Sequence, residues 1–321
     1  MDAMKDVILG IDLGGTKISI GVVEASGKIL RQKTIKTGKK GPHAVIKDIV
    51  SLITTLRSPD EHILAAGIGM AGQIDGKTGV VHFAPNLGWI NFPLRESLEI
   101  ALNIPIKVTN DVRAAAWGEW LYGAGKDCND LICLFIGTGI GAGIVTGGNM
   151  LNGSSNTAGE VGHMTLDMKG PVCTCGNIGC FEALASGWAI AKQAREAVLK
   201  NPLKGEKLLE IIGGTFEEIT AKKIFAAYFL KDPISLKIIE EAKEAWIAGI
   251  AGLANAFNPS KIILGGGIMN ESPFLIECIR EGVSKRGLKT AVESLEIVPA
   301  ALKEKAGIIG ASAVVWNSLN L

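Results

Sequence analysis

The first part of the chain alternates apolar and polar positions. The stretch VILGIDLGGTKISIGVVEASGKILRQKTIKT (7–37) carries β-branched residues on both sides of two tight turns, one near Gly14-Gly15 and one at 25–28. Alternation with a period of two, bounded by turn residues, is typical of strands. We therefore predict three antiparallel strands at the start of the chain.

Helical and extended patterns follow one another in the rest of the chain. Helices are predicted at about 42–57, 93–102 and 111–123, then near 185–200, 220–229, 234–257, 273–284 and 306–318. Strands are predicted at 63–72, 106–110, 261–267 and 295–300, and the segment 130–148 predicts a strand, a glycine turn and a second strand. Strands that alternate with helices indicate an α/β fold.

The segment 130–148 also repeats the plan of the opening. VILGIDLGGTKISIGV and LICLFIGTGIGAGIV differ in their letters but share the order strand, glycine turn, strand. Such internal similarity indicates two halves built alike, and 321 residues are enough for two domains. We expect an N-terminal domain of 1–115 plus 306–321, on which the terminal helix packs back, and a C-terminal domain of 116–305.

Composition narrows the class of protein. Hydrophobic residues make up 47% of the chain and charged residues 20%, the balance of a well-packed globular protein. A net charge of +1 favours neither nucleic acid nor an anionic membrane as a partner. The N-terminus lacks the layout of a signal peptide, and the most apolar segment, 246–257, is too short to span a bilayer. We expect a cytoplasmic protein whose six cysteines stay reduced.

Three glycine turns follow apolar strands. In GIDLGGTK (10–17), Gly14 and Gly15 remove Cβ atoms where backbone N–H groups could face an anion, Thr16 adds a hydroxyl and Lys17 adds a charge. Asp12 precedes the turn, where it could hold the water shell of Mg²⁺. FIGTGIGAG (135–143) and ILGGGI (263–268) repeat the arrangement, and their candidate residues are Thr138, Gly139, Gly265, Gly266 and Gly267.

A single glycine hairpin would be a plain β-turn, but three copies favour nucleotide binding. None of them fits the Walker pattern or a G-x-G-x-x-G that opens a helix. Together with the Asn110-Asp111 pair, DLGGT, IGTGIGAG and ILGGG resemble the motifs of the sugar kinase/actin/Hsp70 ATPase superfamily. The resemblance implies two ribonuclease-H-like lobes with a cleft between them. It also implies that the first two hairpins hold the phosphates of ATP from opposite sides and that the third glycine cluster lies by the adenosine.

Asp111 is the candidate base. It follows the strand 106–110 and opens a helix, so the plain alternative is a capping or early-helix acid. Phosphoryl transfer needs an acceptor hydroxyl held in line and a group that accepts its proton. An ionised aspartate suits this role even when its pKa is low, because the proton leaves late in a loose transition state.

Several polar side chains on turns could bind a polyol through paired hydrogen bonds. Asn86 lies in APNLGW, Glu160 and His163 lie in GEVGH, and Glu182 ends the segment CTCGNIGCFE. Each of them alone could equally be a solvated or capping group. Their common place near the cysteine cluster is what favours a sugar pocket.

The cysteine cluster predicts a metal centre. Cys173, Cys175 and Cys180 form C-x-C-x4-C, glycines between the last two allow a tight loop, and His163 can supply a fourth ligand. Three thiolates and one imidazole fit a closed, structural Zn²⁺ site, which would order a loop that lacks a core. The alternatives are a redox pair, for which C-x-C has the wrong spacing, and loose buried thiols. The other cysteines, Cys128, Cys133 and Cys278, are expected to be ordinary buried thiols.

GEVGH followed by CTCGNIGCFE is similar to the signature of the ROK family (repressors, open reading frames, kinases). This resemblance implies a bilobal kinase with Asp111 as base, ATP with Mg²⁺ as donor, a zinc ion held by the four residues above, and a homodimer. The sugar contacts that it implies are Gly72, Asn86, Asn110, Asp111, Glu160, His163 and Glu182.

The expected function is that of an ATP-dependent hexokinase, with glucose phosphorylated on its 6-hydroxyl. N-acetylmannosamine, N-acetylglucosamine, fructose and mannose are alternative acceptors, and polyphosphate or another nucleoside triphosphate could use the same hairpins. A sugar-responsive repressor of the family carries an N-terminal helix-turn-helix, for which we expect no room before the first hairpin. An ATP-driven chaperone would need a peptide-binding domain, and the expected docking of the terminal helix on the first domain argues against it.

Overall fold

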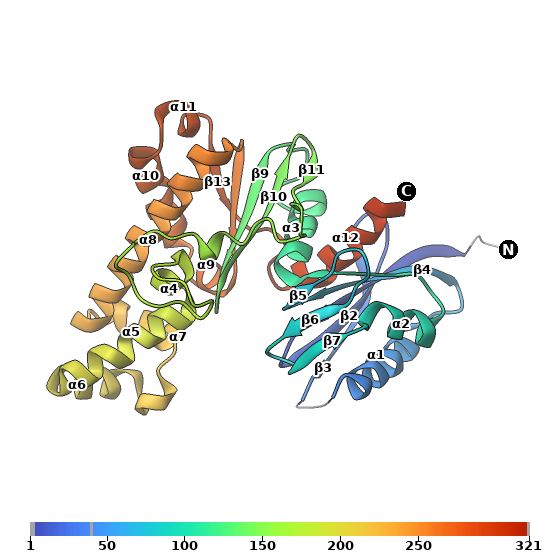
Figure 1. Ribbon diagram of the computed structural model, residues 1–321, viewed down its shortest axis with the longest axis horizontal. Helices are drawn as coiled ribbons and strands as arrows, with labels where there is room; N and C mark the ends of the chain where they lie inside the picture. The colour runs from blue at the N-terminus through green and yellow to red at the C-terminus, as the bar shows by residue number, and fades with distance from the viewer. Residues whose placement is uncertain (1–3, 39–40, 320–321) are drawn as a thin grey trace. The chain divides into compact units, whose positions relative to one another are not determined.

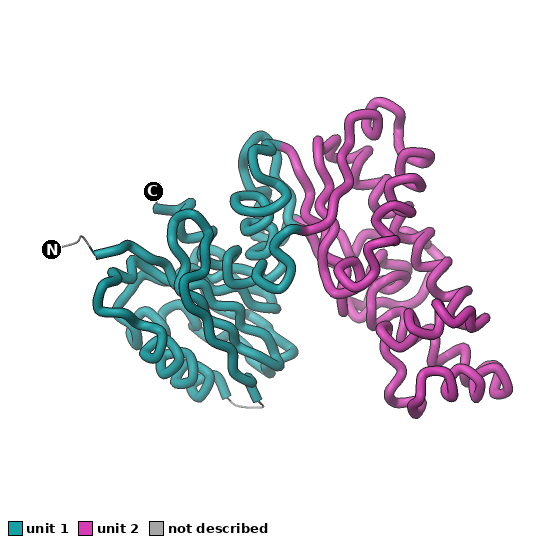
Figure 2. The backbone as a smooth tube through the Cα atoms, turned by 180° about the vertical axis from the view of Figure 1, so that it is seen from behind, with its two compact units in different colours: residues 1–129, 143–158, 301–321 teal, residues 130–142, 159–300 magenta. Residues whose placement is uncertain are grey.

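The computed structural model describes residues 4–38 and 41–319, which form two compact units (Figure 2). Unit 1 comprises residues 1–129, 143–158 and 301–321, and unit 2 comprises residues 130–142 and 159–300. Each unit combines helices with strands of a five-stranded sheet, so the predicted α/β class is confirmed (Figure 1).

The sheet of unit 1 has the strand order β3-β2-β1-β4-β8. Its strands are β1 (Lys5–Leu13), β2 (Lys17–Val23), β3 (Ile29–Lys36), β4 (Glu61–Met70) and β8 (Ile106–Asn110). Strands β1, β2 and β3 pair antiparallel, as the alternation at the start of the chain predicts, whereas β4 pairs parallel to both β1 and β8.

Four longer helices cover this sheet, and a small second sheet extends the unit. The helices are α1 (Pro42–Leu56), α2 (Leu94–Leu102), α3 (Asp111–Tyr122) and α12 (Ala306–Leu319), with the short η3 (Lys303–Lys305) before the last. The small sheet has the order β5-β6-β7, from β5 (Gln73–Ile74), β6 (Val81–Ala84) and β7 (Trp89–Phe92). This sheet was not predicted, because strands of two to four residues are too short to show a period.

The two faces of β1 serve different layers. Leu9 and Ile11 join the core that also contains apolar residues of α1 and α2. Ile8, on the opposite face, packs with Val315 and Trp316 of α12. The period-two pattern of the strand thus supplies both layers.

Some glycines of the strands serve helix packing rather than ligand binding. An ideal Cβ at Gly10 would lie 2.0 Å from the Ile308 carbonyl oxygen, and one at Gly67 would lie 1.8 Å from that of Ala311. Gly10 and Gly67 are partners in the β1–β4 register. Their missing side chains therefore allow α12 to lie directly on the sheet.

The compact units divide the chain differently from the predicted domains. Residues 116–129 and 143–158 group with the N-terminal unit, although the predicted boundary lay at 115. That boundary would have cut α3, which continues to Tyr122 and packs on α12. An ideal Cβ at Gly310 of α12 would lie 1.8 Å from the carbonyl oxygen of Ala114 in α3, so the two helices are in direct contact.

The second five-stranded sheet has the order β11-β10-β9-β12-β13. Its strands are β9 (Leu131–Ile136), β10 (Ile140–Thr146), β11 (Asn149–Met150), β12 (Lys261–Gly265) and β13 (Glu296–Pro299), and the unit boundary falls within β10. The helices of unit 2 are α4 (Phe181–Ala185), α5 (Gly187–Lys200), α6 (Pro202–Ile212), α7 (Ala221–Phe229), α8 (Pro233–Phe257), α9 (Gly267–Glu271), α10 (Phe274–Arg286) and α11 (Lys289–Val292), with η1 (Val161–His163) and η2 (Phe216–Glu218).

All predicted helices and strands are present, with ends shifted by a few residues. Helix α6 was missed because it contains the internal Gly205, which lowers the helical signal. The helix predicted near 185–200 is interrupted at Ser186, which ends α4 and caps α5. Among the described residues, no helix combines the length and apolar character needed to cross a bilayer.

A buried carboxylate that sequence reasoning did not single out connects α3 to the segment before α12. Glu119 is fully buried and accepts the backbone N–H groups of Ala124 at 3.0 Å, Ala301 at 3.0 Å and Leu302 at 2.7 Å. We expect Glu119→Ala to lower the free energy of unfolding by about 3–5 kcal/mol, because three N–H groups lose their acceptor. Urea denaturation measures this.

The exposed Glu96 of α2 offers a matched control. Glu96→Ala is expected to change the free energy of unfolding by less than about 0.5 kcal/mol. Equal effects of the two substitutions would contradict the role given to Glu119.

Candidate active site and metal centre

Asp12 lies near the end of β1, directly before the first glycine turn. Burial raises the pKa of its carboxyl above the ordinary value, Lys17 lowers it, and the neighbouring Asp111 raises it. Helix α12 also begins here, since an ideal Cβ at Gly307 would lie 2.7 Å from the Asp12 Cγ. The negative charges of Asp12 and Asp111 repel each other, and a divalent cation bound nearby would stabilise the charged form of both carboxyl groups.

The first glycine turn is closed by its own backbone. The Gly14 N–H donates to the Lys17 carbonyl at 2.9 Å, and the Thr37 hydroxyl donates to the Gly14 carbonyl at 2.7 Å. Thr16 and Lys17 are exposed at the tip. The turn is therefore held by Thr37, directly after β3, while its tip stays open to a ligand.

Asn86 lies close to this turn, and Gly72 contacts the strand β6 that leads to Asn86. An ideal Cβ at Gly15 would lie 2.8 Å from the Asn86 Cβ, so this glycine is needed for the approach of the β6–β7 turn. Gly72 follows β4 with φ of +150°, and an ideal Cβ there would lie 2.8 Å from the Phe83 carbonyl oxygen of β6. The small sheet thus places Asn86, an exposed side chain, beside the first hairpin.

Asn110 and Asp111 form the junction between β8 and α3. The Asn110 Oδ1 caps the helix by accepting the N–H groups of Val112 at 2.9 Å and Arg113 at 3.2 Å. Asp111 is the first helical residue, and its Oδ1 accepts the Val112 N–H at 3.0 Å. Burial nevertheless raises the pKa of Asp111 above the ordinary value, against the lowering effect of the backbone N–H groups. The residue is both an early-helix acid and a carboxylate with increased basicity.

The second glycine turn, between β9 and β10, caps α5. The N–H groups of Gly187 and Trp188 donate to the carbonyls of Gly137 and Thr138, at 2.8 Å and 3.1 Å. In a trans peptide the C=O and the next N–H point in opposite directions. The N–H groups of Thr138 and Gly139 therefore point away from the start of α5, which is the arrangement that a phosphate-binding turn requires.

Glu160 and His163 share one short turn that packs on β10. The His163 N–H donates to the Glu160 carbonyl at 3.1 Å across η1. Both glycines of GEVGH are needed. An ideal Cβ at Gly162 would lie 2.1 Å from the Ile140 carbonyl oxygen, and Gly159 has φ of +94°, which other residues rarely adopt. The turn is thereby fixed beside the second hairpin.

Glu182, in the first turn of α4, contacts the same hairpin. Its Oε2 accepts the Ile140 N–H at 2.8 Å, and its Oε1 accepts the Trp188 Nε1–H at 3.2 Å. An ideal Cβ at Gly139 would lie 2.5 Å from Oε2. Gly139 thus makes room for this carboxylate.

The third glycine cluster connects β12 to α9. Gly266 has φ of +90°, and an ideal Cβ there would lie 2.5 Å from the Ile136 carbonyl oxygen. An ideal Cβ at Gly265 would lie 2.8 Å from the Phe135 ring, whereas Gly267 has no atom within 4 Å of its ideal Cβ. Gly265 and Gly266 are therefore required by the packing of β9 on β12, and Gly267 is the open member of the three.

Unit 2 contains a pocket of about 790 Å³ that joins the second and third glycine turns. Thr138 and Gly267 both line it. Its apolar lining includes Trp188, Phe225 and Phe229, from α5 and α7. Such a cavity, apolar with a few polar groups at its edge, suits the base and ribose of a nucleotide.

The predicted metal ligands converge. The ligand atoms of His163, Cys173, Cys175 and Cys180 all lie within 4.8 Å of one another. The Sγ atoms of Cys175 and Cys180 are 3.7 Å apart, and the Cys173 Sγ is 3.8 Å from the His163 Nδ1. A tetrahedral zinc ion with Zn–S bonds of about 2.3 Å places its sulfur ligands about 3.8 Å apart. The cluster therefore fits a four-coordinate metal, with the His163 Nε2 left for another partner.

The loop between these ligands is shaped by its glycines. Gly176 has φ of +90° and Gly179 has φ of +67°, and an ideal Cβ at Gly179 would lie 1.5 Å from the Asp167 carbonyl oxygen. Burial and the neighbouring thiols raise the pKa of Cys180 to about 12, whereas the Asn177 N–H lowers that of Cys175. A metal that deprotonates Cys180 would therefore release a proton near neutral pH.

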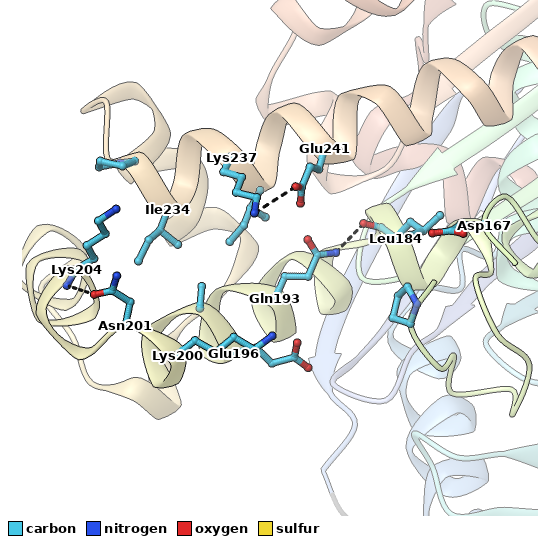
Figure 3. Close-up of a pocket in the computed structure, with 14 residues that line it drawn as sticks. Asp167, Leu184, Gln193, Glu196, Lys200, Asn201, Lys204, Ile234, Lys237 and Glu241 are labelled. Atoms are coloured by element: carbon cyan, nitrogen blue, oxygen red, sulfur yellow. Dashed lines mark hydrogen bonds and ion pairs between the residues drawn. The ribbon is translucent and has the colours of Figure 1, made fainter. Parts of the chain in front are cut away.

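A second hollow in unit 2, of about 680 Å³, lies among α5, α6 and α8 (Figure 3). Its lining includes the apolar Leu184 and Ile234 and the three lysines Lys200, Lys204 and Lys237. None of the predicted site residues lines it.

Comparison with known proteins assigns the family. The ROK family model matches residues 8–318. The chain belongs to the ROK family. A ROK family glucokinase from Streptomyces griseus, solved in complex with glucose and AMPPNP, has 34% sequence identity and a TM-score of 0.80, covering 96% of this chain and 98% of that one. The actin-like ATPase fold of ROK sugar kinases is thereby confirmed.

Relatives in the ROK family include both enzymes and regulators. The glucokinase of Streptomyces coelicolor is 37% identical over 306 residues, which are 95% of this chain and 96% of the relative. A xylose repressor of Caldicellulosiruptor bescii is 33% identical over 324 residues, which are 98% of this chain and 80% of the repressor.

The aromatic lining of the nucleotide-sized pocket was missed from the sequence. Phe225 and Phe229 have the helical spacing that is also typical of a core, and Trp188 lies on a different helix. No short motif distinguishes an aromatic residue that lines a cavity from one that fills it. By contrast, the motif residues Asp12, Asp111 and the cysteines lie where their spacing predicts.

Proposed function

We propose that this protein is an ATP-dependent hexokinase of the glucokinase type, which transfers the terminal phosphoryl group of ATP to the 6-hydroxyl of glucose. The observation that carries the proposal is Asp111, a carboxylate of raised pKa within electrostatic reach of Asp12 at the first glycine hairpin. The glucokinases that resemble the chain over nearly its whole length support the same assignment.

In this reaction Asp111 would accept the proton of the attacking hydroxyl. Its place at the start of α3 fixes the carboxylate, because Oδ1 is held by the Val112 N–H. A pKa above the ordinary value makes its ionised form a better proton acceptor. Holding the hydroxyl in line and neutralising charge at the phosphates would supply the rest of the catalytic effect.

The sugar contacts proposed on unit 1 are Gly72, Asn86 and Asn110. Because the Asn110 Oδ1 already caps α3, its contribution would be the Nδ2–H donors. On unit 2 we propose Glu160, Glu182 and the His163 Nε2.

On the donor side, we propose that the backbone N–H groups of the hairpins at Gly14–Thr16 and Thr138–Gly139, together with Lys17, bind the phosphates. Asp12 would hold the water shell of Mg²⁺, which supplies charge neutralisation at the phosphates. The apolar pocket next to Thr138 and Gly265–Gly267 supports a nucleoside triphosphate rather than polyphosphate, which would leave that pocket empty.

We propose zinc as the metal of the His163–cysteine cluster, with a structural role. Four protein ligands leave no open coordination position, so its effect is to hold Glu160, His163 and Glu182 through the loop that they flank. We also infer a cytoplasmic homodimer, which light scattering would report as a mass near twice 33.7 kDa.

A coupled assay tests the function. ATP and polyphosphate are each offered with glucose, mannose, fructose, N-acetylglucosamine and N-acetylmannosamine, and kcat/KM is compared. Glucose with ATP is expected to give the highest value. A higher value for another sugar would correct the substrate, and glucose binding without transfer from any donor would favour a sugar-responsive regulator.

The pH dependence of kcat/KM is expected to reflect Asp111. The ionised form is the active base, so activity falls as pH drops through its pKa, and burial places this acid limb above the ordinary aspartate value of 3.8. A pH profile of initial rates, corrected for the titration of ATP, measures the limb. Full activity down to pH values near 3.8 would contradict the assignment.

A further inference from the structure

We propose that Trp188 and Glu182 form a brace that holds the second glycine turn in its phosphate-binding conformation, so that both are positioning residues for the donor. The inference deepens the proposed function, on which it rests. It gives Glu182 a role toward ATP in addition to the proposed contact with sugar, and it gives Trp188 a role beyond lining the pocket.

The first part of the brace is the start of α5. Four N–H groups at a helix start need acceptors from outside the helix. Here the hairpin supplies two, the carbonyls of Gly137 and Thr138, the Ser186 hydroxyl accepts from Ala189 at 3.3 Å, and the Ser186 N–H donates to the Glu182 carbonyl at 3.0 Å. The contact is tight, because an ideal Cβ at Gly187 would lie 2.8 Å from the Gly137 carbonyl oxygen. The turn and the helix start therefore fix each other.

The second part is the Glu182 carboxylate. It receives one N–H from the hairpin, at Ile140, and one from the Trp188 indole, so it bridges the two. Both partners are donors, and a carboxylate is the side chain that can accept from both at once. A glutamine could accept only through its one oxygen, and its amide would face a second donor.

The brace acts on the phosphates and not on the nucleoside. The brace orients the peptide groups that contain the N–H groups of Thr138 and Gly139. The base and ribose would instead lie against the side chains of the pocket. Loss of the indole N–H should therefore weaken ligands that carry phosphates and leave adenosine nearly unaffected, as long as an aromatic ring remains at position 188.

Trp188→Phe tests this, because it keeps a ring and leaves Glu182 in place for the sugar. By isothermal titration calorimetry with Mg²⁺, AMPPNP is expected to bind roughly tenfold more weakly, since a hydrogen bond to a charged group is lost, while adenosine changes by less than about twofold. In kinetics, KM for ATP rises by a similar factor and KM for glucose is unchanged.

Two further variants separate the brace from general damage. Trp120→Phe is the matched control, because the Trp120 Nε1–H donates to the Cys128 carbonyl at 2.9 Å, in unit 1, and its loss should leave AMPPNP binding unchanged. In a Glu182→Gln background, Trp188→Phe should add less than about a twofold effect, because both residues act through one contact.

Equal weakening of adenosine and AMPPNP in Trp188→Phe would overturn the brace and show that the residue acts only through the base pocket. Unchanged AMPPNP binding would overturn it as well. Failure of the proposed function looks different, since the unsubstituted protein would then bind no AMPPNP or transfer no phosphate to any sugar.

Discussion

Asp111→Asn is expected to lower kcat by about three orders of magnitude, the effect of removing a general base from phosphoryl transfer. Asparagine has the shape of aspartate, and its Oδ1 can still accept the Val112 N–H that now fixes the carboxylate at 3.0 Å. The start of α3 should therefore be retained, and so should the affinity for glucose. Single-turnover kinetics and calorimetric titration with glucose measure the two quantities.

Asp60 provides the control for this substitution. It is an exposed aspartate at the opposite end of the β1–β4 pair, where its carbonyl accepts the Lys5 N–H at 3.0 Å. Asp60→Asn should leave kcat within about twofold, as expected for a surface site. If Asp111→Asn were as active as this control, another group would have to accept the proton.

Cys180→Ser is expected to remove the metal and to destabilise unit 2. Zinc in comparable peptide sites contributes about 10–16 kcal/mol of binding free energy at neutral pH. Even if only about 3 kcal/mol of this contributes to the free energy of unfolding, its loss lowers Tm by roughly 10 °C for a domain of this size. Elemental analysis of the purified protein and calorimetric melting measure the metal content and the Tm.

Cys278→Ser is the matched control, because Cys278 lies in α10 and outside the cluster. This substitution should leave the metal content unchanged and Tm within a few degrees of that of the unsubstituted protein. Addition of a chelator to the unsubstituted protein should reproduce the effect of Cys180→Ser. Purified protein without stoichiometric metal, or with the same Tm in both variants, would contradict a structural zinc site.

Much of the candidate site could be predicted because its residues lie within short segments of the sequence. The spacing of Cys173, Cys175 and Cys180 is enough to predict a tight loop, and the structure brings these thiols together with His163. Asp111 follows a strand and opens a helix, which the pattern of apolar positions shows directly. In both cases the residues that matter are local, or joined by one turn.

The reasons for several glycines could not be predicted. Gly15 and Gly139 were interpreted as openings for phosphate, and the structure shows that each also makes room for a side chain distant in sequence, Asn86 and Glu182. Gly10 serves only the packing of α12 on the sheet. The sequence shows where each glycine stands, but whether a neighbouring atom excludes a Cβ there, and which atom does so, is found only in the folded chain.

The sequence alone determined the α/β class, the order of most of the longer strands and helices, the candidate metal-binding loop and the aspartate that starts α3, because periodicity and spacing act over a few residues. Only the tertiary structure decided the limits of the two units, the buried acceptor Glu119, the aromatic pocket and the bonding of Glu182 to the second hairpin. These features depend on contacts between segments tens to hundreds of residues apart, whose partners are selected by packing and by the need of buried N–H groups for an acceptor.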